Sequence, residues 1–409
     1  MQLNNKLLQI KNYYYRCTKK LNILVKSRYK IVKVHSFKNY SEEYDDIDFT
    51  SLSNNRKTYV FPIHFFTEND KLPIEYNLDD LYYAKIIECK IIGQSNVILT
   101  KNNFLLYDYL YDKVKSYVNV TDGGLLLLFN RVIHFKQNYI LNYLQESPVR
   151  IENGILLSGN FSNNYFHFVF EFLVKFHIIS KLSIDTKIPI IIDNHVKRVS
   201  QFEELITIFN KENRKLIYIQ KGNLYTINEL HYFSFINNIP PNLKRKIYEV
   251  ESTDYAFDFD SINFLKTTIK EHFNRFSLET PKKIFVSRND CLIRRNNETD
   301  IYPILHEHGF VIIQPEKMSI KEQYFHFANA QHIIAASGAA LTNIIFCKPN
   351  CKILVLQSVK SQITIFSSIA AYLKTDMQYI TPTIDELKSH PDFHIPKELL
   401  KQYLSKHDN

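Results

Sequence analysis

The alternation of short apolar segments with amphipathic ones, from about residue 150 onward, is the feature that most constrains the fold. Short buried strands that alternate with helices form parallel sheets, because each helix carries the chain back to the start of the next strand. We therefore expect a parallel α/β unit in this part of the chain. Its expected strands are residues 155–158, 188–192 and 216–219, and its expected helices are residues 165–181 and 199–213.

A second series of the same kind begins after the turn-forming residues 237–242. Two doubly wound units in tandem direct the carboxyl ends of their strands toward a shared crevice, where folds of this class bind ligands. The expected strands of the second unit are residues 284–287, 310–313, 332–336, 352–356 and 377–380, and its expected helices are residues 261–276, 300–308, 320–328, 339–346 and 363–374.

The length of 409 residues also favours two globular units, since one hydrophobic core rarely serves more than about 250–300 residues. Alternating apolar residues at 85–92 predict a half-buried strand ahead of the first unit. We divide the chain into a basic arm at 1–40, an N-terminal domain with a β-rich lead-in at 41–250, a C-terminal domain at 251–380 and a helical tail at 381–409.

The net charge of +9 is concentrated at the N-terminus. Residues 1–40 hold ten Lys or Arg and no acidic residue, which leaves a net charge of −1 for the rest of the chain. Apolar residues recur at helical spacing from Leu3 to Leu24 and are flanked by lysines. Residues 1–30 therefore form either a helix that lies on an anionic membrane surface or a helix packed on the body of the protein. We do not expect a nucleic acid partner, because no binding module accompanies the arm.

The apolar segments are too short to cross a membrane. None approaches the roughly 20 residues that a spanning helix needs, and no apolar signal-peptide segment follows the first residues. The five cysteines include no CxxC pair, which disfavours a disulfide framework and a zinc knuckle. We expect a cytoplasmic protein without a bound metal or cofactor, peripheral at the inner face of the membrane if the arm binds there.

A run of small residues follows the expected strand 332–336 and opens the next expected helix. Small side chains let a ligand approach the backbone, and a helix N-terminus presents N–H groups and partial positive charge to an anion. A diphosphate meets these requirements. The alternative is a tight strand-to-helix turn that needs small residues for packing alone. The run is Ser337, Gly338, Ala339, Ala340, Leu341, Thr342 and Asn343.

A basic cluster follows the first strand of the same unit. Arginines just past a strand end can bind phosphate oxygens in a bidentate manner. A solvated loop is the alternative, but two anion-binding elements on adjacent strand ends favour a phosphate site. The cluster contains Arg288, Arg294 and Arg295, followed by Asn297 and Glu298.

His167 and Glu171 are four residues apart on an expected helix of the first unit, so they share one face. The helix begins near Asn164 and Tyr165, close to the expected crevice. Transfer to a hydroxyl group requires a base, and either His167 or Glu171 could accept the proton. A His–Glu pair that only stabilises the helix is the alternative.

At these three places the sequence resembles glycosyltransferase family 61. That family has an Asn-Tyr-Tyr-His-Trp helix start followed by an acid, an Ile-Ser-Arg-Arg strand end with a basic run and Asn-Glu, a Gly-Phe strand ending in Pro-Glu, a Glu-Gln pair, and His-Gly-Ala-Gly-Leu-Thr-Asn. The counterparts are residues 164–168 with Glu171, Ser287-Arg288 with Arg294, Arg295, Asn297 and Glu298, Gly309-Phe310 with Pro315-Glu316, Glu322-Gln323, and residues 337–343. The resemblance covers roughly residues 85–360.

Three positions depart from the family pattern. Ser337 stands where many members have His, so any role of that imidazole in binding phosphate is lost. Ala340 replaces Gly, which leaves the loop less backbone freedom. Phe168 replaces Trp, a change that affects packing.

The resemblance implies an α/β fold of the GT-B type, with two Rossmann-like domains that face a central cleft. It implies an inverting glycosyltransferase with a nucleotide-sugar donor, usually a UDP-sugar, held by the C-terminal domain. The acceptor would be a glycan or a lipid-linked glycan in capsule, lipopolysaccharide or related surface-polysaccharide synthesis. We expect the donor to contact Arg288, Arg294, Arg295, Asn297, Glu298, Gln323, Ser337, Gly338, Ala339, Ala340, Thr342 and Asn343, and the acceptor to lie near Asn164 and Tyr165.

The C-terminal domain has no DxD motif at the expected place, so cationic side chains and backbone N–H groups are expected to replace a metal ion. Two other functions stay open. A sugar-nucleotide epimerase or hydrolase would use the same cleft without a glycan acceptor. A non-catalytic protein that binds nucleotide sugars would keep the phosphate site but tolerate the loss of Glu171.

Overall fold

The structure is a computed structural model. It describes residues 28–68, 71–96, 98–106, 132–135, 138–143, 145–239, 251–290, 295–357, 363–380 and 392–407. Most of the basic arm lies outside these residues, and with it both alternatives for that arm, the membrane-bound helix and the packed helix. Arg294 and part of the helical tail also lie outside them. Within the described residues, no helix is both long enough and apolar enough to span a bilayer.

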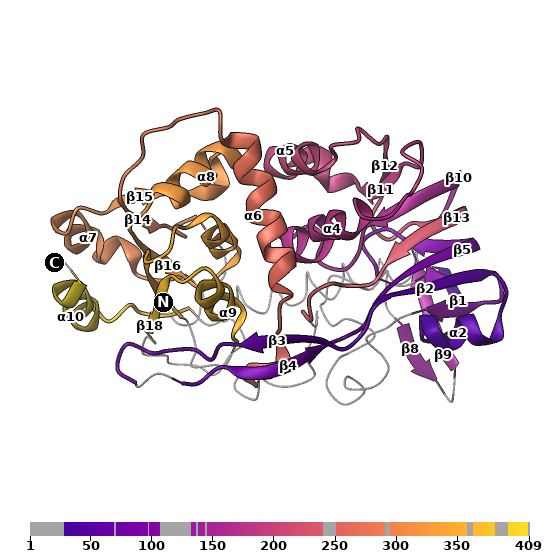
Figure 1. Ribbon diagram of the computed structural model, residues 1–409, viewed down its shortest axis with the longest axis horizontal. Coiled ribbons are helices and arrows are strands. Elements are labelled where there is room, and N and C mark those ends of the chain that lie inside the picture. The colour runs from indigo at the N-terminus through magenta and orange to yellow at the C-terminus, as the bar shows by residue number, and fades with distance from the viewer. Residues whose placement is uncertain are drawn as a thin grey trace, which may run out of the picture.

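An 11-stranded mixed sheet forms the N-terminal half of the described structure (Figure 1). The strand order is β12-β11-β10-β13-β5-β6-β7-β1-β9-β8, and β2 pairs with β5. Strand β10 is parallel to both β11 and β13, whereas β13 is antiparallel to β5. The strands are β1 Arg28–His35, β2 Ile47–Ser53, β5 Leu81–Ile92, β6 Ile98–Leu99, β7 Phe104–Leu106, β8 Val132–Phe135, β9 Asn138–Tyr143, β10 Glu146–Leu157, β11 Ile190–Asp193, β12 Leu216–Ile219 and β13 Leu224–Phe233.

The expected mixture of helices and parallel strands is confirmed, but the first unit is not purely parallel. Strand β13 is absent from the sequence-based prediction, and it joins the parallel strands to the antiparallel lead-in. Its sequence mixes polar and apolar residues, so it lacks the continuous apolar run typical of a strand that is buried on both faces. The expected strand at 85–92 is the second part of β5.

The expected helix at 165–181 is divided into four short pieces. They are α3 Tyr165–His167, a π turn at Phe168–Phe172, a 3₁₀ turn at Leu173–Lys175 and α4 Phe176–Ile179. All five residues of the π turn are buried, so packing acts on every side of this segment instead of on one face. Such π turns occur mostly as local insertions in α-helices and are frequent at functional sites.

The other helices of this half cover the sheet and its ends. They are α2 Phe37–Glu43, a 3₁₀ turn at Asn194–Arg198 and α5 Ser200–Phe209. Helix α5 ends four residues earlier than the sequence pattern predicts for 199–213, since Asn210 leaves the helical conformation with φ −80° and ψ 59°.

A parallel sheet of five strands forms the C-terminal half, in the order β15-β14-β16-β17-β18. Each strand predicted for this unit is present within two residues. The strands are β14 Lys283–Val286, β15 Val311–Ile313, β16 His332–Ala336, β17 Lys352–Leu356 and β18 Asp376–Ile380. The helices are a 3₁₀ turn at Ser252–Asp254, α6 Phe259–Phe273, a 3₁₀ turn at Glu298–Asp300, α7 Tyr302–Glu307, a 3₁₀ turn at Pro315–Lys317, α8 Ile320–Asn329, the 3₁₀ helix η10 Ala339–Phe346, α9 Ile365–Tyr372 and α10 Lys397–His407.

One hydrophobic cluster continues from the first sheet to the second. Helix α6 stands between the two halves (Figure 1), and the aromatic ring of Phe166 lies 6.5 Å from that of Phe257 and 5.9 Å from that of Phe366. Apolar residues from both sheets belong to this cluster. Helix α10, which follows Pro396 as the sequence predicts, packs its Tyr403 among residues of the C-terminal sheet.

A long hairpin, β3 Arg56–Val60 and β4 Ile74–Leu78, runs along both halves (Figure 1). Its Arg56 side chain is 7% exposed and donates to the Asp258 carboxylate at 2.7 Å. The same guanidinium donates to the carbonyl oxygens of Asp79 and Ile236, each at 2.8 Å. Arg56 therefore fixes the hairpin to the chain segment that leads into α6.

We expect Arg56→Met to lower the free energy of unfolding by about 3 kcal/mol, because it leaves Asp258 and two carbonyl oxygens without their donor. Urea unfolding of both proteins measures the difference. Lys57→Met is the matched control. Lys57 is the next residue and pairs with Glu75 at 2.7 Å, but its side chain is 67% exposed. Its replacement should leave the urea midpoint close to wild type. Equal losses in the two variants would contradict the role given to Arg56.

A buried carboxylate closes the carboxyl end of β11. Asp193 accepts hydrogen bonds from the hydroxyls of Ser158 at 2.8 Å and Ser162 at 2.6 Å, and from the backbone N–H of Gln94 at 2.9 Å. Burial raises the pKa of Asp193 to about 6, although these hydrogen bonds oppose the shift. The folded protein therefore favours the protonated acid more than the unfolded chain does.

Because the folded pKa lies above the unfolded one, the stabilising contribution of protonated Asp193 is present at low pH and lost as pH rises through about 6. We expect the unfolding free energy of wild type, relative to Asp193→Asn, to fall between about pH 4 and pH 7. Paired denaturant titrations across this range measure the difference. A difference that does not change with pH would show that folding does not raise the pKa of Asp193.

Candidate active site

The strand order of the C-terminal sheet produces a topological switch point between β14 and β16. At such a point the connections leave in opposite directions, which opens a crevice at the carboxyl ends of the strands. Arg288 follows β14, and Gly338 follows β16. The basic cluster and the run of small residues thus begin on the two strands that border the switch point.

The side chain of Arg288 lies directly against Gly338. A Cβ atom added to Gly338 would be 2.3 Å from Nη1 of Arg288, far inside van der Waals contact. Gly338 has φ 170°, an extended conformation that any residue adopts, so the need for glycine is one of space. The structure therefore brings these two predicted anion-binding elements into contact.

Glu298 holds the segment that carries Arg288. Its carboxylate accepts hydrogen bonds from the Ser287 hydroxyl, from the backbone N–H of Arg288 at 2.9 Å and from the Tyr302 hydroxyl at 2.8 Å. Glu298 is 1% exposed. A buried acceptor with three donors fixes the end of β14, and it positions Arg288 through the backbone.

Two other members of the basic cluster contact the C-terminal tail. Arg295 donates to the Asp392 carboxylate from Nε at 3.0 Å and from Nη2 at 2.7 Å. The Asn297 side-chain oxygen accepts from the backbone N–H of Ile395 at 2.7 Å. In this arrangement both side chains hold the tail.

A hydrogen-bond relay joins the middle of η10 to the N-terminal half. The Tyr165 hydroxyl donates to the Asn343 side-chain oxygen at 2.7 Å, and Asn343 Nδ2 donates to Gln323 Oε1 at 2.7 Å. Gln323 in turn donates to the carbonyl oxygen of Pro315 at 2.8 Å. Burial raises the pKa of Tyr165 well above its usual range, so this hydroxyl remains a donor.

The remaining residues of the small-residue run have different exposures. Ser337, Ala339 and Ala340 are half-buried, whereas Thr342 is fully buried. The backbone N–H of Ser337 donates to the Leu356 carbonyl oxygen at 3.0 Å, which continues the sheet one residue beyond β16. The first two residues of η10, Ala339 and Ala340, carry only methyl side chains.

His167 and Glu171 are in contact across the junction of α3 and the π turn. Nδ1 of His167 lies within hydrogen-bond distance of a Glu171 carboxylate oxygen. The Glu171 side chain is 2% exposed, and that of His167 is 18% exposed. The imidazole also stacks on Phe161, with 5.1 Å between ring centroids. A ring held through Nδ1 has its other nitrogen, Nε2, available to a substrate.

The start of this helix is fixed by its own cap. The Asn164 side-chain oxygen accepts from the backbone N–H of Phe166 at 3.0 Å. Asn164 itself is exposed, and Tyr165, the next residue, enters the relay to Asn343. His167, one of the two candidate bases, therefore lies two residues after Tyr165, which contacts the small-residue run directly through Asn343.

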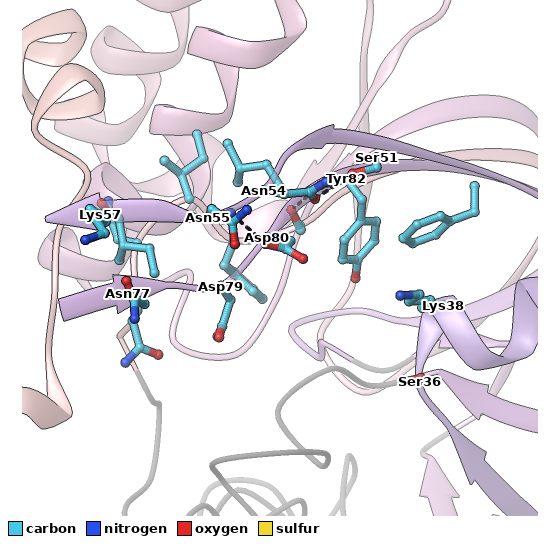
Figure 2. Close-up of a pocket in the computed structure, with 18 of the residues that line it drawn as sticks. Ser36, Lys38, Ser51, Asn54, Asn55, Lys57, Asn77, Asp79, Asp80 and Tyr82 are labelled. Atoms are coloured by element: carbon cyan, nitrogen blue, oxygen red, sulfur yellow. Dashed lines mark hydrogen bonds between the residues drawn. The ribbon is translucent and has the colours of Figure 1, made fainter.

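Sequence reasoning missed a cavity of about 870 Å³ in the N-terminal half (Figure 2). Its lining includes three doublets of polar residues at turns, namely Asn54-Asn55, Asp79-Asp80 and Asn237-Asn238. The doublets are visible in the sequence, but turns are commonly rich in Asn and Asp, so nothing there sets them apart. Only the folded chain shows that they surround one space.

The candidate site lies within a stretch of the chain that matches a known protein family. Among the described residues, no group of three His, Cys, Asp or Glu side chains is placed to hold a metal ion. No curated protein matches the sequence. The family model Glycosyltransferase 61 matches residues 134–354, which is more than half of the 409-residue chain and includes both candidate site regions. The chain therefore belongs to glycosyltransferase family 61 and is a glycosyltransferase.

Proposed function

We propose that this glycosyltransferase is an inverting enzyme of the GT-B type, which transfers a sugar from a UDP-sugar to a glycan acceptor. The contact between Arg288 and Gly338 at the switch point carries the proposal. The synthesis of capsule, lipopolysaccharide or a related surface polysaccharide is the pathway class that fits such an acceptor. Family membership implies a nucleotide-sugar donor and an acceptor, and the choice of UDP and of a glycan goes beyond it.

The donor diphosphate would lie at the carboxyl ends of β14 and β16. Arg288 supplies a guanidinium there, and the start of η10 supplies backbone N–H groups. Both interact most strongly with the charge that accumulates on UDP as the bond to the sugar breaks. This arrangement supports a leaving group stabilised by the protein's own groups, without a required metal ion.

His167 would be the general base, with Glu171 as its positioning residue. Glu171 is buried, so its carboxylate is poorly placed to contact an acceptor, whereas the His167 ring is partly exposed. A carboxylate on Nδ1 orients the imidazole and stabilises the imidazolium that forms when Nε2 accepts a proton. This is the division of roles that buried acids and histidines have in catalytic triads.

In the reaction, the acceptor oxygen attacks the anomeric carbon on the face opposite the diphosphate. The carbon–oxygen bond to the β-phosphate breaks, and UDP leaves with its charge held by Arg288. The acceptor proton moves to Nε2 of His167. One in-line displacement of this kind inverts the anomeric centre.

We expect UDP to raise the melting temperature more than UMP does, because only UDP has the β-phosphate that reaches Arg288 and Gly338. Differential scanning fluorimetry at matched nucleotide concentration measures both shifts. In Arg288→Gln the two shifts should become similar. Equal shifts for UDP and UMP in the wild-type protein would reject the phosphate site. Loss of transfer on addition of EDTA, with recovery on Mn²⁺, would reject the metal-free mechanism.

We expect His167→Gln to lower kcat by about 10²–10⁴-fold, because glutamine cannot accept the proton. UDP should stabilise this variant as much as wild type, since the donor contacts lie in the other half. Glu171→Gln should lower kcat less and also leave the UDP shift unchanged. Steady-state kinetics with a donor and an acceptor measure both. A larger decrease in kcat for Glu171→Gln than for His167→Gln would assign the base role to Glu171. If both variants keep wild-type activity, this helix has only a structural role.

A further inference from the structure

The polar cavity of the N-terminal half lies at the edge of the sheet where β10 and β13 end. Strand β13 is followed by Ser234 and Asn237, and both line the cavity. Strand β5, which is antiparallel to β13, begins at this edge with Leu81. Because β11 and β13 flank β10 on opposite sides, this edge also holds the switch point of the parallel strands. The cavity lies beside that point, where β13 ends next to the start of β5.

The side chains around the cavity are mostly neutral and polar. Figure 2 shows Asn54, Asn55 and Asp80 gathered at the turns next to the β3–β4 hairpin, with Lys38 on the opposite side and Tyr82 between them. Amide groups both donate and accept hydrogen bonds, as sugar hydroxyls do. The charged residues of the lining balance, with Lys38 and Lys57 against Asp79 and Asp80. Such a lining suits an uncharged, hydroxyl-rich ligand.

Aromatic rings complete the wall. The ring of Tyr82 stacks on that of Phe49, with 4.8 Å between centroids and 28° between planes. Both residues line the cavity. Apolar ring faces pack against the C–H groups of a sugar ring, while amides at the rim bind its hydroxyls.

One polar group in this wall is unsatisfied. The Tyr82 residue is 8% exposed, and its hydroxyl oxygen has no hydrogen-bond partner among the residues that the structure describes. A buried hydroxyl without a partner costs folding free energy. The oxygen has less than 1 Å² of accessible surface, so we expect a small shift of the Tyr82 ring to let a ligand hydroxyl in the cavity supply the missing partner.

The cavity is also connected to the candidate base. Asn237, which lines it, donates from Nδ2 to the carbonyl oxygen of Phe170 at 2.8 Å. Phe170 precedes Glu171 in the π turn. The Asn237 side-chain oxygen accepts from the backbone N–H of Asp258 at 2.8 Å, so this amide is fixed at both ends. A ligand that contacts Asn237 in the cavity would therefore touch a side chain that is hydrogen-bonded to the backbone just before Glu171.

We infer that this cavity binds an uncharged oligosaccharide segment of the acceptor glycan. The assignment of this sugar to the acceptor rests on the proposed function. The phosphate features belong to the other sheet, so this edge is left for the second substrate. Sugar binding itself rests only on the lining, the Tyr82 hydroxyl and the position beyond the carboxyl end of β13. The cavity thus holds acceptor units beyond the one that reacts.

The test is saturation-transfer NMR and titration of the full chain, without nucleotide, against cellohexaose, maltohexaose, chitohexaose and an oligogalacturonate of the same length. We expect at least one neutral probe to bind. Tyr82→Phe removes only the hydroxyl, and Asn54→Ala removes one amide at the rim. Each should weaken binding of that probe by about five- to tenfold, as expected for one lost hydrogen bond.

Tyr218→Phe and Asn228→Ala are matched controls on β12 and β13, outside the cavity lining, and should bind the probe like wild type. The inference is overturned if no neutral probe binds, if the galacturonate binds more tightly, or if the Tyr82 and Asn54 variants bind like the controls. The UDP shift, measured on the same samples, separates the two proposals. If a sugar binds but UDP does not raise the melting temperature, the cavity inference stands and the donor assignment is rejected.

Discussion

The contacts of the candidate site depend on a relay of three neutral side chains, Tyr165, Asn343 and Gln323. Asn343 is fully buried, and both ends of its amide are used, one by each half of the molecule. A buried amide left unpaired is costly, so this relay fixes the start of the His167 helix relative to η10. The family pattern places Asn at both 164 and 343, and in the structure these positions have separate roles, as a helix cap and as the inter-half contact.

Space, more than charge, determines how Arg288 and Gly338 lie at the proposed phosphate site. Arg288 can lie across the end of β16 because Gly338 has no side chain, and Glu298 holds the backbone of Arg288 from beneath. Replacement of the family's His by Ser337 and of Gly by Ala340 leaves this contact intact, since neither position is the one that Arg288 covers. Among the residues that the structure describes, the positive charge proposed to act at the switch point comes from the Arg288 guanidinium and from backbone N–H groups.

The two sheets supply the two sides of the proposed reaction in the same way, through the carboxyl ends of strands that border a switch point. In the C-terminal sheet these ends carry Arg288 and Gly338. In the N-terminal sheet they carry the His167 helix after β10 and the cavity residues after β13. Aromatic residues such as Phe166 fill the space between the halves, so the two halves are in direct apolar contact next to the candidate site.

The sequence by itself determined the C-terminal sheet, because strands such as β16 and β17 are continuous apolar runs buried on both faces and bounded by turns. It also supplied the motifs from which the candidate site is proposed. Only the tertiary structure decided that β13 extends the first sheet, that a buried π turn follows His167, and that Arg295 holds the tail. The cavity could not be predicted either. Its wall is held by contacts such as Arg56 to Ile236, which join residues 180 positions apart, and local patterns carry no information about such pairs.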